Sequence, residues 1–287
     1  NEELDMLANV SISYGVRGLI YFFYGKSSGQ IGLNEFYSRG LTDTTQLPRT
    51  LNVYNQNKWE QIKLISERMK TWEPYIMSFD NTNRSTYILR LERSSLIDET
   101  FFNDVLSYEP IPSDYMIASQ IPEAVSERYL QVGKFNNPDE MYSRYFMIVN
   151  RRCSPIDTSD PGGVNGRRSV TIKLDSASTH FAGFNNWSIY DLERDSLIKT
   201  FDKRIVSTTS LGWFNPGEGK LYKLAPVMQE GGTLVADEEV GGNFDCKGEV
   251  NNNGYEIRIL PGATINFSDS SARIIMTGGD FRSGSTP

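Results

Sequence analysis

The clearest periodic pattern in the chain is an apolar stripe between residues 56 and 77. Five large apolar residues recur there at steps of three and four: Trp59, Ile62, Ile65, Met69 and Trp72. This spacing places them on one face of an α-helix, so we expect Trp59 and Trp72 to be buried. A proline blocks the continuation of a helix, and Pro74 therefore predicts an end near residue 75.

A shorter amphipathic stretch opens the chain. Residues 2–14 carry apolar side chains on one side, which predicts a second helix, and the apolar run at 18–24 predicts a buried strand between the two helices. One strand with two helices leaves apolar surface uncovered. We therefore expect this region to be part of a longer, modular protein.

After Asp80 the pattern changes from a helical to a two-residue period. Segments that alternate apolar and polar residues are separated by clusters of Gly, Pro, Asn and Asp, which predicts antiparallel strands forming a β-sandwich over 84–227. The expected strands are 86–91, 115–120, 128–135, 144–150, 169–174, 187–192, 197–201 and 221–224.

From Gln229 the strands become shorter, and Gly, Asn and Asp turns recur between them. Residues 259–267 have the form of one rung of a β-solenoid, so 229–287 predicts a solenoid-like tail of two to three rungs. Such rungs bury their core only by stacking, and this number is marginal, so we expect a truncated segment. The predicted fold class is mostly β with a small α/β part at 1–80.

The composition limits the kinds of partner that we expect for this protein. A net charge of −7 argues against nucleic acid, which requires a basic face. The longest apolar run, 18–24, is too short to span a bilayer. With 15 Tyr, 15 Phe and 4 Trp beside many Asn, Ser, Thr and Gly residues, the composition is typical of secreted or cell-surface proteins that handle sugars.

The residues that bind metals or act as nucleophiles are sparse. Cys153 and Cys246 fall in different predicted regions, which favours two separate thiols, with a disulfide as the alternative. Without a Cys/His cluster we expect no zinc site and no cofactor. His180 is the only histidine, so any Ser-His-Asp system would need it, but its polar surroundings favour an exposed loop.

Four segments carry a resemblance to known modules. Residues 13–24, SYGVRGLIYFFY, resemble a stretch near the end of the (β/α)8 barrel of β-galactosidase-like glycoside hydrolases. Residues 145–151 and 216–222 resemble the C-terminal β-sandwich of such enzymes, and 260–265 resemble the opening of a right-handed parallel β-helix. The resemblance implies that 1–80 supply helix seven, strand eight and helix eight of a barrel.

The resemblance also implies a function. The chain would be the C-terminal region of a secreted, multidomain carbohydrate-active enzyme that acts on a polysaccharide or oligosaccharide. Catalysis in such barrels uses two carboxylates on strands that would precede Asn1, and we predict no catalytic residue in this chain. Glu35 and Asp43 are interpreted as solvated loop carboxylates. The alternative is a non-catalytic carbohydrate-binding or cell-surface structural module.

Three aromatic residues are candidates for sugar binding. Phe22 and Tyr24 share one face of the predicted strand by the two-residue period. The resemblance aligns Tyr24 with an aromatic residue that forms the floor of a sugar site. Trp187 is either an exposed sugar platform or a core residue.

Overall fold

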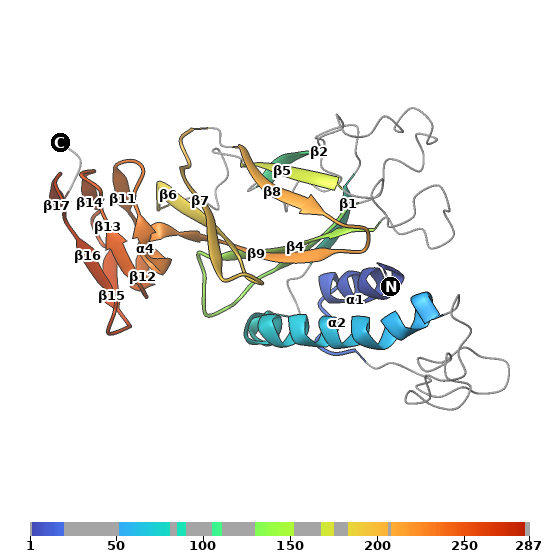
Figure 1. The fold of residues 1–287 in the computed structure, drawn as a ribbon. Helices are drawn as coiled ribbons and strands as arrows, with labels where there is room; N and C mark the ends of the chain where they lie inside the picture. Colours follow the sequence, from blue (N-terminus) through green and yellow to red (C-terminus); the bar gives the residue numbers. More distant parts are fainter. Residues whose placement is uncertain are drawn as a thin grey trace.

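The computed structural model describes residues 2–19, 52–80, 85–89, 105–110, 130–151, 168–174, 183–205 and 208–284. Within these ranges the chain is mostly β with few helices, as predicted, and the sheets are open, with no closed barrel. Figure 1 shows two helices along one side of a pair of sheets, with a stack of short strands at one end. The predicted strand at 18–24 lies outside the described residues from residue 20 onward.

The two predicted helices are present as α1 (Glu2–Ser13) and α2 (Asn52–Ser78). The expected end of α2 at Pro74 is wrong, because Pro74 lies inside the helix. Proline removes one backbone hydrogen bond, but the turn after it carries Ile76, and Phe79 follows; both side chains are buried against the sheet. The predicted burial of Trp72 is confirmed, with no exposed surface, and the Trp59 side chain lies outside the described residues.

The helices cover one face of a six-stranded antiparallel sheet of order β1-β3-β4-β9-β6-β7. Its strands are β1 (Ser85–Leu89), β3 (Leu130–Phe135), β4 (Arg144–Asn150), β6 (Asn186–Asp191), β7 (Ser196–Asp202) and β9 (Gly219–Pro226). Alternate residues of β4 explain why the helices cover this face of the sheet. Tyr145, Met147 and Val149 join a core with Ile12 of α1 and Trp72 of α2.

The opposite face of this sheet packs on a second antiparallel sheet of order β2-β5-β8. Its strands are β2 (Val105–Pro110), β5 (Arg168–Leu174) and β8 (Thr208–Phe214). Phe146 and Ile148 of β4 share a core with Val170 and Ile172 of β5, so both sides of β4 are buried. The sequence pattern missed β2 and β8, and the predicted strand at 115–120 lies outside the described residues.

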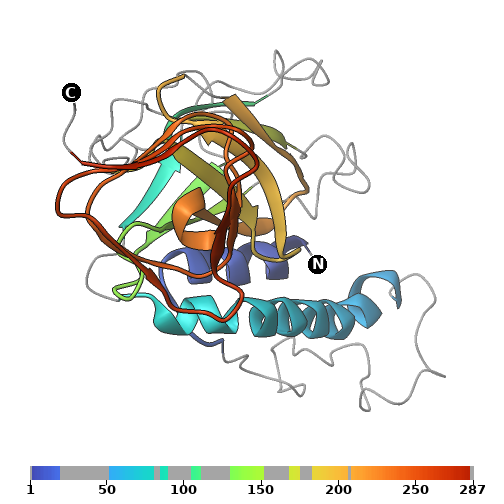
Figure 2. The same ribbon diagram turned by 90° about the vertical axis from the view of Figure 1, so that its left-hand side faces the viewer.

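After β9 a single helical turn, α4 (Val227–Glu230), leads into three parallel ladders. They are β10-β13-β16, β11-β14-β17 and β12-β15, built from β10 (Gly232–Thr233), β11 (Glu238–Val240), β12 (Asn243–Cys246), β13 (Glu249–Asn251), β14 (Ile257–Ile259), β15 (Thr264–Phe267), β16 (Arg273–Ile275) and β17 (Phe281–Ser283). Paired residues lie 18 to 24 positions apart, as in Gly232 with Val250 and Val250 with Ile274. Each repeat is one coil, and Figure 2 looks along the stack of coils.

Candidate functional site

The structure describes one of the three predicted sugar-binding residues. Phe22 and Tyr24 lie outside the described residues, as do Glu35, Asp43 and His180, so sugar binding at Phe22 and Tyr24 stays a prediction. Cys246 is a buried free thiol that donates to the carbonyl oxygen of Gly248 at 3.3 Å, and Cys153 lies outside the described residues.

Trp187 lies on β6 and is fully buried. Its Nε1 donates to the carbonyl oxygen of Phe184 at 3.2 Å, and the two rings meet edge to face with centroids 6.3 Å apart. The indole belongs to the core shared by the two sheets and the first coil. Trp187 is therefore a core residue and not an exposed sugar platform, because no face of the ring is open to a sugar.

A small polar pocket of about 100 Å³ lies where the β3–β4 hairpin meets the first coil. Its hydrogen-bonding side chains are Asp139, Glu140, Gln229, Asn243, Asp245 and Lys247. Asp139, Asn243 and Asp245 are exposed at its rim, whereas Gln229 is buried. We call this the junction pocket. It combines segments that are about a hundred residues apart in the sequence.

Tyr142 gives the junction pocket one aromatic wall. Its half-buried ring meets Phe184 edge to face at 5.0 Å, and Phe184 meets Phe244 of β12 in the same way at 5.1 Å. The Tyr142 ring therefore packs on Phe184, which itself packs on Phe244 of the first coil. A fixed ring can contact a ligand with little loss of side-chain entropy.

A charged cluster adjoins the pocket and is built on Glu140. Lys223 Nζ lies 2.8 Å from Oε2 of Glu140, Lys247 Nζ lies 2.6 Å from Oε1, and the Tyr145 hydroxyl donates to Oε2. Lys223 also pairs with Glu230 at 2.8 Å. The Lys223 side chain is almost fully buried, so the two carboxylates hold one buried ammonium between them.

The electrostatics of this cluster fix its protonation. Burial by itself would raise the pKa of Glu140, but Lys223, Lys247 and the Tyr145 hydroxyl together lower it to about 2. Burial and the neighbouring Glu140 charge raise the pKa of Tyr145 above its ordinary value. Glu140 is therefore ionised and Tyr145 neutral at physiological pH, and neither is poised to exchange a proton. The cluster holds the hairpin on the coil.

Another carboxyl group has the raised pKa that a general acid requires, but it lies in the wrong place. Burial raises the pKa of Glu238 to about 7. The side chain is fully buried between β6 and the first coil, where the backbone N–H groups of Asn185, Asn186 and Glu239 donate to it. A substrate cannot reach a carboxyl group in that position.

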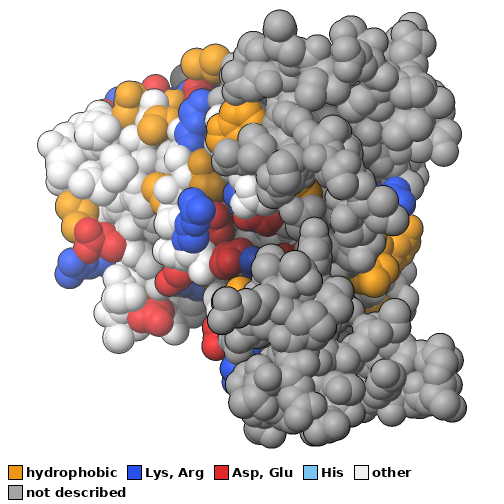
Figure 3. All heavy atoms as spheres, turned by 45° about the vertical axis from the view of Figure 1, so that its right-hand side comes forward, with side chains coloured by type: hydrophobic (Ala, Val, Ile, Leu, Met, Phe, Trp, Pro, Cys, Tyr) orange, Lys and Arg blue, Asp and Glu red, His pale blue; other side chains and the backbone are white. Residues whose placement is uncertain are grey.

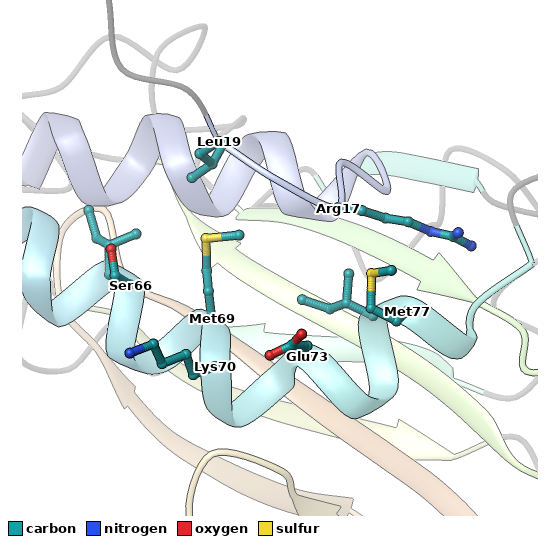
Figure 4. Close-up of a pocket in the computed structure, with 9 residues that line it drawn as sticks. Arg17, Leu19, Ser66, Met69, Lys70, Glu73 and Met77 are labelled. Atoms are coloured by element: carbon teal, nitrogen blue, oxygen red, sulfur yellow. The ribbon is translucent and has the colours of Figure 1, made fainter.

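A second pocket, of about 230 Å³, lies between α2 and the segment that follows α1. Figure 4 shows Leu19 and Met69 pointing toward each other across it, while Arg17 extends away along the segment. The Arg17 guanidinium donates to the carbonyl oxygen of Phe79. The chain continues from Leu19 directly into residues outside the described ranges, so we assign no ligand to this pocket.

The described part of the chain holds no group of three or more His, Cys, Asp or Glu side chains placed to bind a metal ion. None of its helices combines the length and the apolar character needed to span a membrane. Acidic and basic side chains are interspersed on the face drawn in Figure 3.

Comparison with known proteins gives matches among solved structures only. No family model and no curated protein sequence matches the chain. Among solved structures, a putative alpha-N-acetylgalactosaminidase from Bacillus halodurans C-125 is 11% identical, with a TM-score of 0.23, over 34% of this chain and 18% of that one. The chain therefore has a weak, partial structural neighbour that is a putative glycosidase, and it spans less than a fifth of that neighbour's length.

Sequence reasoning missed the charged cluster and the junction pocket. The signal that could have indicated the cluster is in β9, where Lys220 and Lys223 interrupt a run that is otherwise apolar. All eight residues of β9 are buried, and a buried lysine needs a carboxylate partner. The identity of the partners, Glu140 and Glu230, could not be read from this signal.

Proposed function

We propose that this chain is a non-catalytic, saccharide-binding part of a secreted carbohydrate-active enzyme of the glycoside-hydrolase kind, and that the junction pocket is a binding site. In this proposal, α1 and α2 are closing elements of a (β/α)8 barrel. The coils are the start of a right-handed parallel β-helix. The ligand of this part is a polysaccharide or oligosaccharide, and the catalytic carboxylates of the enzyme lie on a part of it outside this chain.

The observation that carries the proposal is the combination of groups at the junction pocket. Tyr142 offers an aromatic surface for the C–H groups of a sugar ring. The carboxylates of Asp139 and Asp245 accept hydrogen bonds from hydroxyl groups, and the Asn243 amide both donates and accepts. A few convergent polar groups beside an aromatic wall are typical of small-molecule sites.

The volume of the pocket limits the mode of binding. About 100 Å³ is below the several hundred Å³ of a pocket that encloses a whole ligand. The pocket therefore takes the edge of one sugar residue, and neighbouring residues of a polysaccharide lie along the exposed rim. This mode gives weak affinity at each site, which suits a module that keeps an enzyme near an insoluble substrate.

The non-catalytic assignment is supported by two carboxyl groups of the described residues whose pKa values are strongly shifted. Glu140 is held ionised by two lysines, and Glu238 is buried under backbone donors. Glycoside cleavage needs one accessible acid and one accessible nucleophile or base. Neither of these two groups can take either role.

The test is binding of the 287-residue chain to a panel of polysaccharides, measured by affinity electrophoresis and calorimetry. We expect binding to at least one polysaccharide, weakened about tenfold or more by Asn243→Ala and by Asp245→Ala. Leu197→Ala is the matched control, because Leu197 is an exposed side chain on β7, outside the pocket. Absence of binding across the panel, or equal losses in all three variants, contradicts the proposal.

An activity screen on the same panel and on aryl-glycosides tests the second half of the proposal. We expect no turnover. Turnover that disappears in a Glu35→Gln/Asp43→Asn double variant would assign catalysis to those two residues and overturn the non-catalytic assignment.

A structural module of a cell-surface protein is the second candidate. The dense hydrogen bonding of Asn185 and Asn186 to the first coil favours it, because these bonds fix the coil rigidly on the sheet. The binding experiment separates the two candidates, since a purely structural module binds none of the polysaccharides.

A further inference from the structure

The cationic and amide donors at the junction pocket already have acceptors within the protein. Lys247 Nζ lies 2.6 Å from Oε1 of Glu140. The Nε2 of Gln229 donates to the Ser143 hydroxyl and to Glu230, at 3.2 Å in both bonds. These contacts join the hairpin to the first coil, so a ligand that needs these donors would compete with them.

The acceptor groups of the pocket, in contrast, are open. The carboxylates of Asp139 and Asp245 form no hydrogen bond and no ion pair within the described residues, and both residues are exposed at the rim. Gln229 also lines the pocket and is 4% exposed, and its Oε1 has no hydrogen-bond partner in the same part of the chain. A buried acceptor that lacks a partner needs a donor from outside the protein.

The lining of the pocket carries an excess of negative charge. Its charged side chains are three carboxylates and one lysine, a net charge of −2: Asp139, Glu140, Asp245 and Lys247. Burial lowers the pKa of Lys247, but the hydrogen bond and charge of Glu140 and the charges of Glu230 and Asp245 outweigh it, so the pKa is raised. The electrostatic field in the pocket therefore favours a positive group.

The neighbouring cations lie outside this lining. The Lys223 ammonium is buried between two carboxylates, and the Arg144 guanidinium donates to two backbone carbonyl oxygens of the hairpin. Neither of them forms an ion pair with Asp139 or Asp245 in the structure as described. The two rim carboxylates thus remain available to a ligand.

Building on the proposed function, we propose that the junction pocket selects saccharides that carry a free, protonated amino group. An ammonium group donates three hydrogen bonds and accepts none, which matches the open oxygens of Asp139, Asp245 and Gln229. The ring of Tyr142 adds a cation–π attraction from the wall. The volume of about 100 Å³ exceeds the roughly 30 Å³ of one water-sized group, so the ammonium and the edge of its sugar residue fit.

The test compares oligosaccharides that differ only in this group. Tetramers of glucosamine and of galactosamine are titrated into the 287-residue chain by calorimetry at pH 5.5, beside their N-acetylated counterparts, in which a neutral amide replaces the amine. We expect at least one free-amine tetramer to bind about tenfold more tightly than its counterpart. This preference should fall in about 0.5 M salt, which screens exposed charges.

A double variant, Asp139→Asn/Asp245→Asn, removes the two rim charges and keeps side chains of nearly the same shape. We expect it to reduce the preference for the free amine to about threefold or less. The matched control is Asp195→Asn/Asp280→Asn, which removes two exposed carboxylates outside the pocket and should keep the preference. This control is needed because the whole chain has a net charge of −7 and attracts any cation.

The outcomes separate this inference from the proposed function. If both forms of the tetramers bind equally, this inference is overturned and the proposed function stands. A preference that survives Asp139→Asn/Asp245→Asn, or that falls equally in the control, assigns it to the overall charge of the chain and also overturns the inference. So does a lysine tetrapeptide that binds as tightly as the free-amine tetramer. Absence of binding by every saccharide overturns both proposals.

Discussion

Asn186 and Glu238 join the sheet to the first coil through two hydrogen bonds. The backbone N–H and the Nδ2 of Asn186 both donate to Oε2 of Glu238 at 3.0 Å. The Asn186 Oδ1 accepts from the backbone N–H groups of Val235 and Ala236 at 2.9 and 3.1 Å. One asparagine at the start of β6 therefore satisfies backbone and side-chain groups of the coil that would otherwise be buried without partners.

We predict that the contact between the sheet and the first coil at Glu238 becomes less stable as pH rises through neutrality. Burial raises the pKa of Glu238 to about 7 in the folded chain, against 4.5 ordinarily. The folded state then binds this proton more tightly than the unfolded state, so the stabilisation is complete below about pH 4.5 and is lost as pH rises through 7. The melting temperature should be higher at pH 5.5 than at pH 8.

The control for this prediction is Glu238→Gln, in which no carboxyl titrates. We expect a lower melting temperature at every pH, because a glutamine NH₂ faces N–H donors, and no fall between pH 5.5 and 8. The window is nearly free of other titrating side chains, since the chain has one histidine. An unchanged pH dependence in Glu238→Gln would contradict the assignment.

Glu140→Gln should destabilise the chain by about 2 kcal/mol. This is below the roughly 3–5 kcal/mol typical of breaking a buried ion pair, because Lys223 keeps Glu230 as a partner. The lowered pKa of Glu140, about 2, gives stability that is present above pH 4.5 and is lost as pH falls toward 2. Urea unfolding should show the difference between wild type and variant shrinking from pH 5 to pH 2.5.

A matched variant for this measurement is Asp280→Asn, which removes an exposed ion pair with Arg282. Exposed pairs contribute little, so we expect a much smaller change in the free energy of unfolding than for Glu140→Gln. If the two substitutions had equal effects, the Glu140 cluster would have no special role in stability.

Gly133→Ala should loosen the contact between α1 and the sheet. A Cβ at Gly133 of β3 would overlap the carbonyl oxygen of Ser13 at the end of α1, and that backbone atom cannot move without displacing the helix. Gly18→Ala is the matched control, because a Cβ there meets no atom within 4 Å. We expect a clear loss of melting temperature in the first variant only; similar melts would show that α1 does not rest on β3.

Trp72→Ala should cost about 3–5 kcal/mol, the range for removing a fully buried large aromatic side chain. The ring fills the core between α2 and the six-stranded sheet. Leu64→Ala on the same helix is the control, since Leu64 is exposed. Chemical denaturation of both variants measures the difference, and an unchanged midpoint for Trp72→Ala would show that the stripe does not face the core.

Local sequence patterns were sufficient to predict whether most elements are helices or strands. The three- and four-residue spacing of Ile62, Ile65 and Trp72 determined α2 and its buried face, and the two-residue alternation of the segment around β3 determined a strand. The end of α2 was not determined locally. Pro74 favours an end there, but burial of Ile76 and Phe79 against the sheet outweighs the lost hydrogen bond.

The contacts of Glu140 with Lys223 and of Asn186 with Glu238 could be found only from the tertiary structure. Glu140 and Lys223 are 83 residues apart, and Asn186 and Glu238 are 52 apart, and no periodic pattern connects such distant polar residues. Trp187 likewise could be a surface platform or a core residue on sequence alone, and packing between the sheets decided it. The sequence by itself determined which segments are helical or extended, because that depends on neighbours a few positions away. Only the fold decided which charges meet, because pairing at low dielectric depends on distance in space.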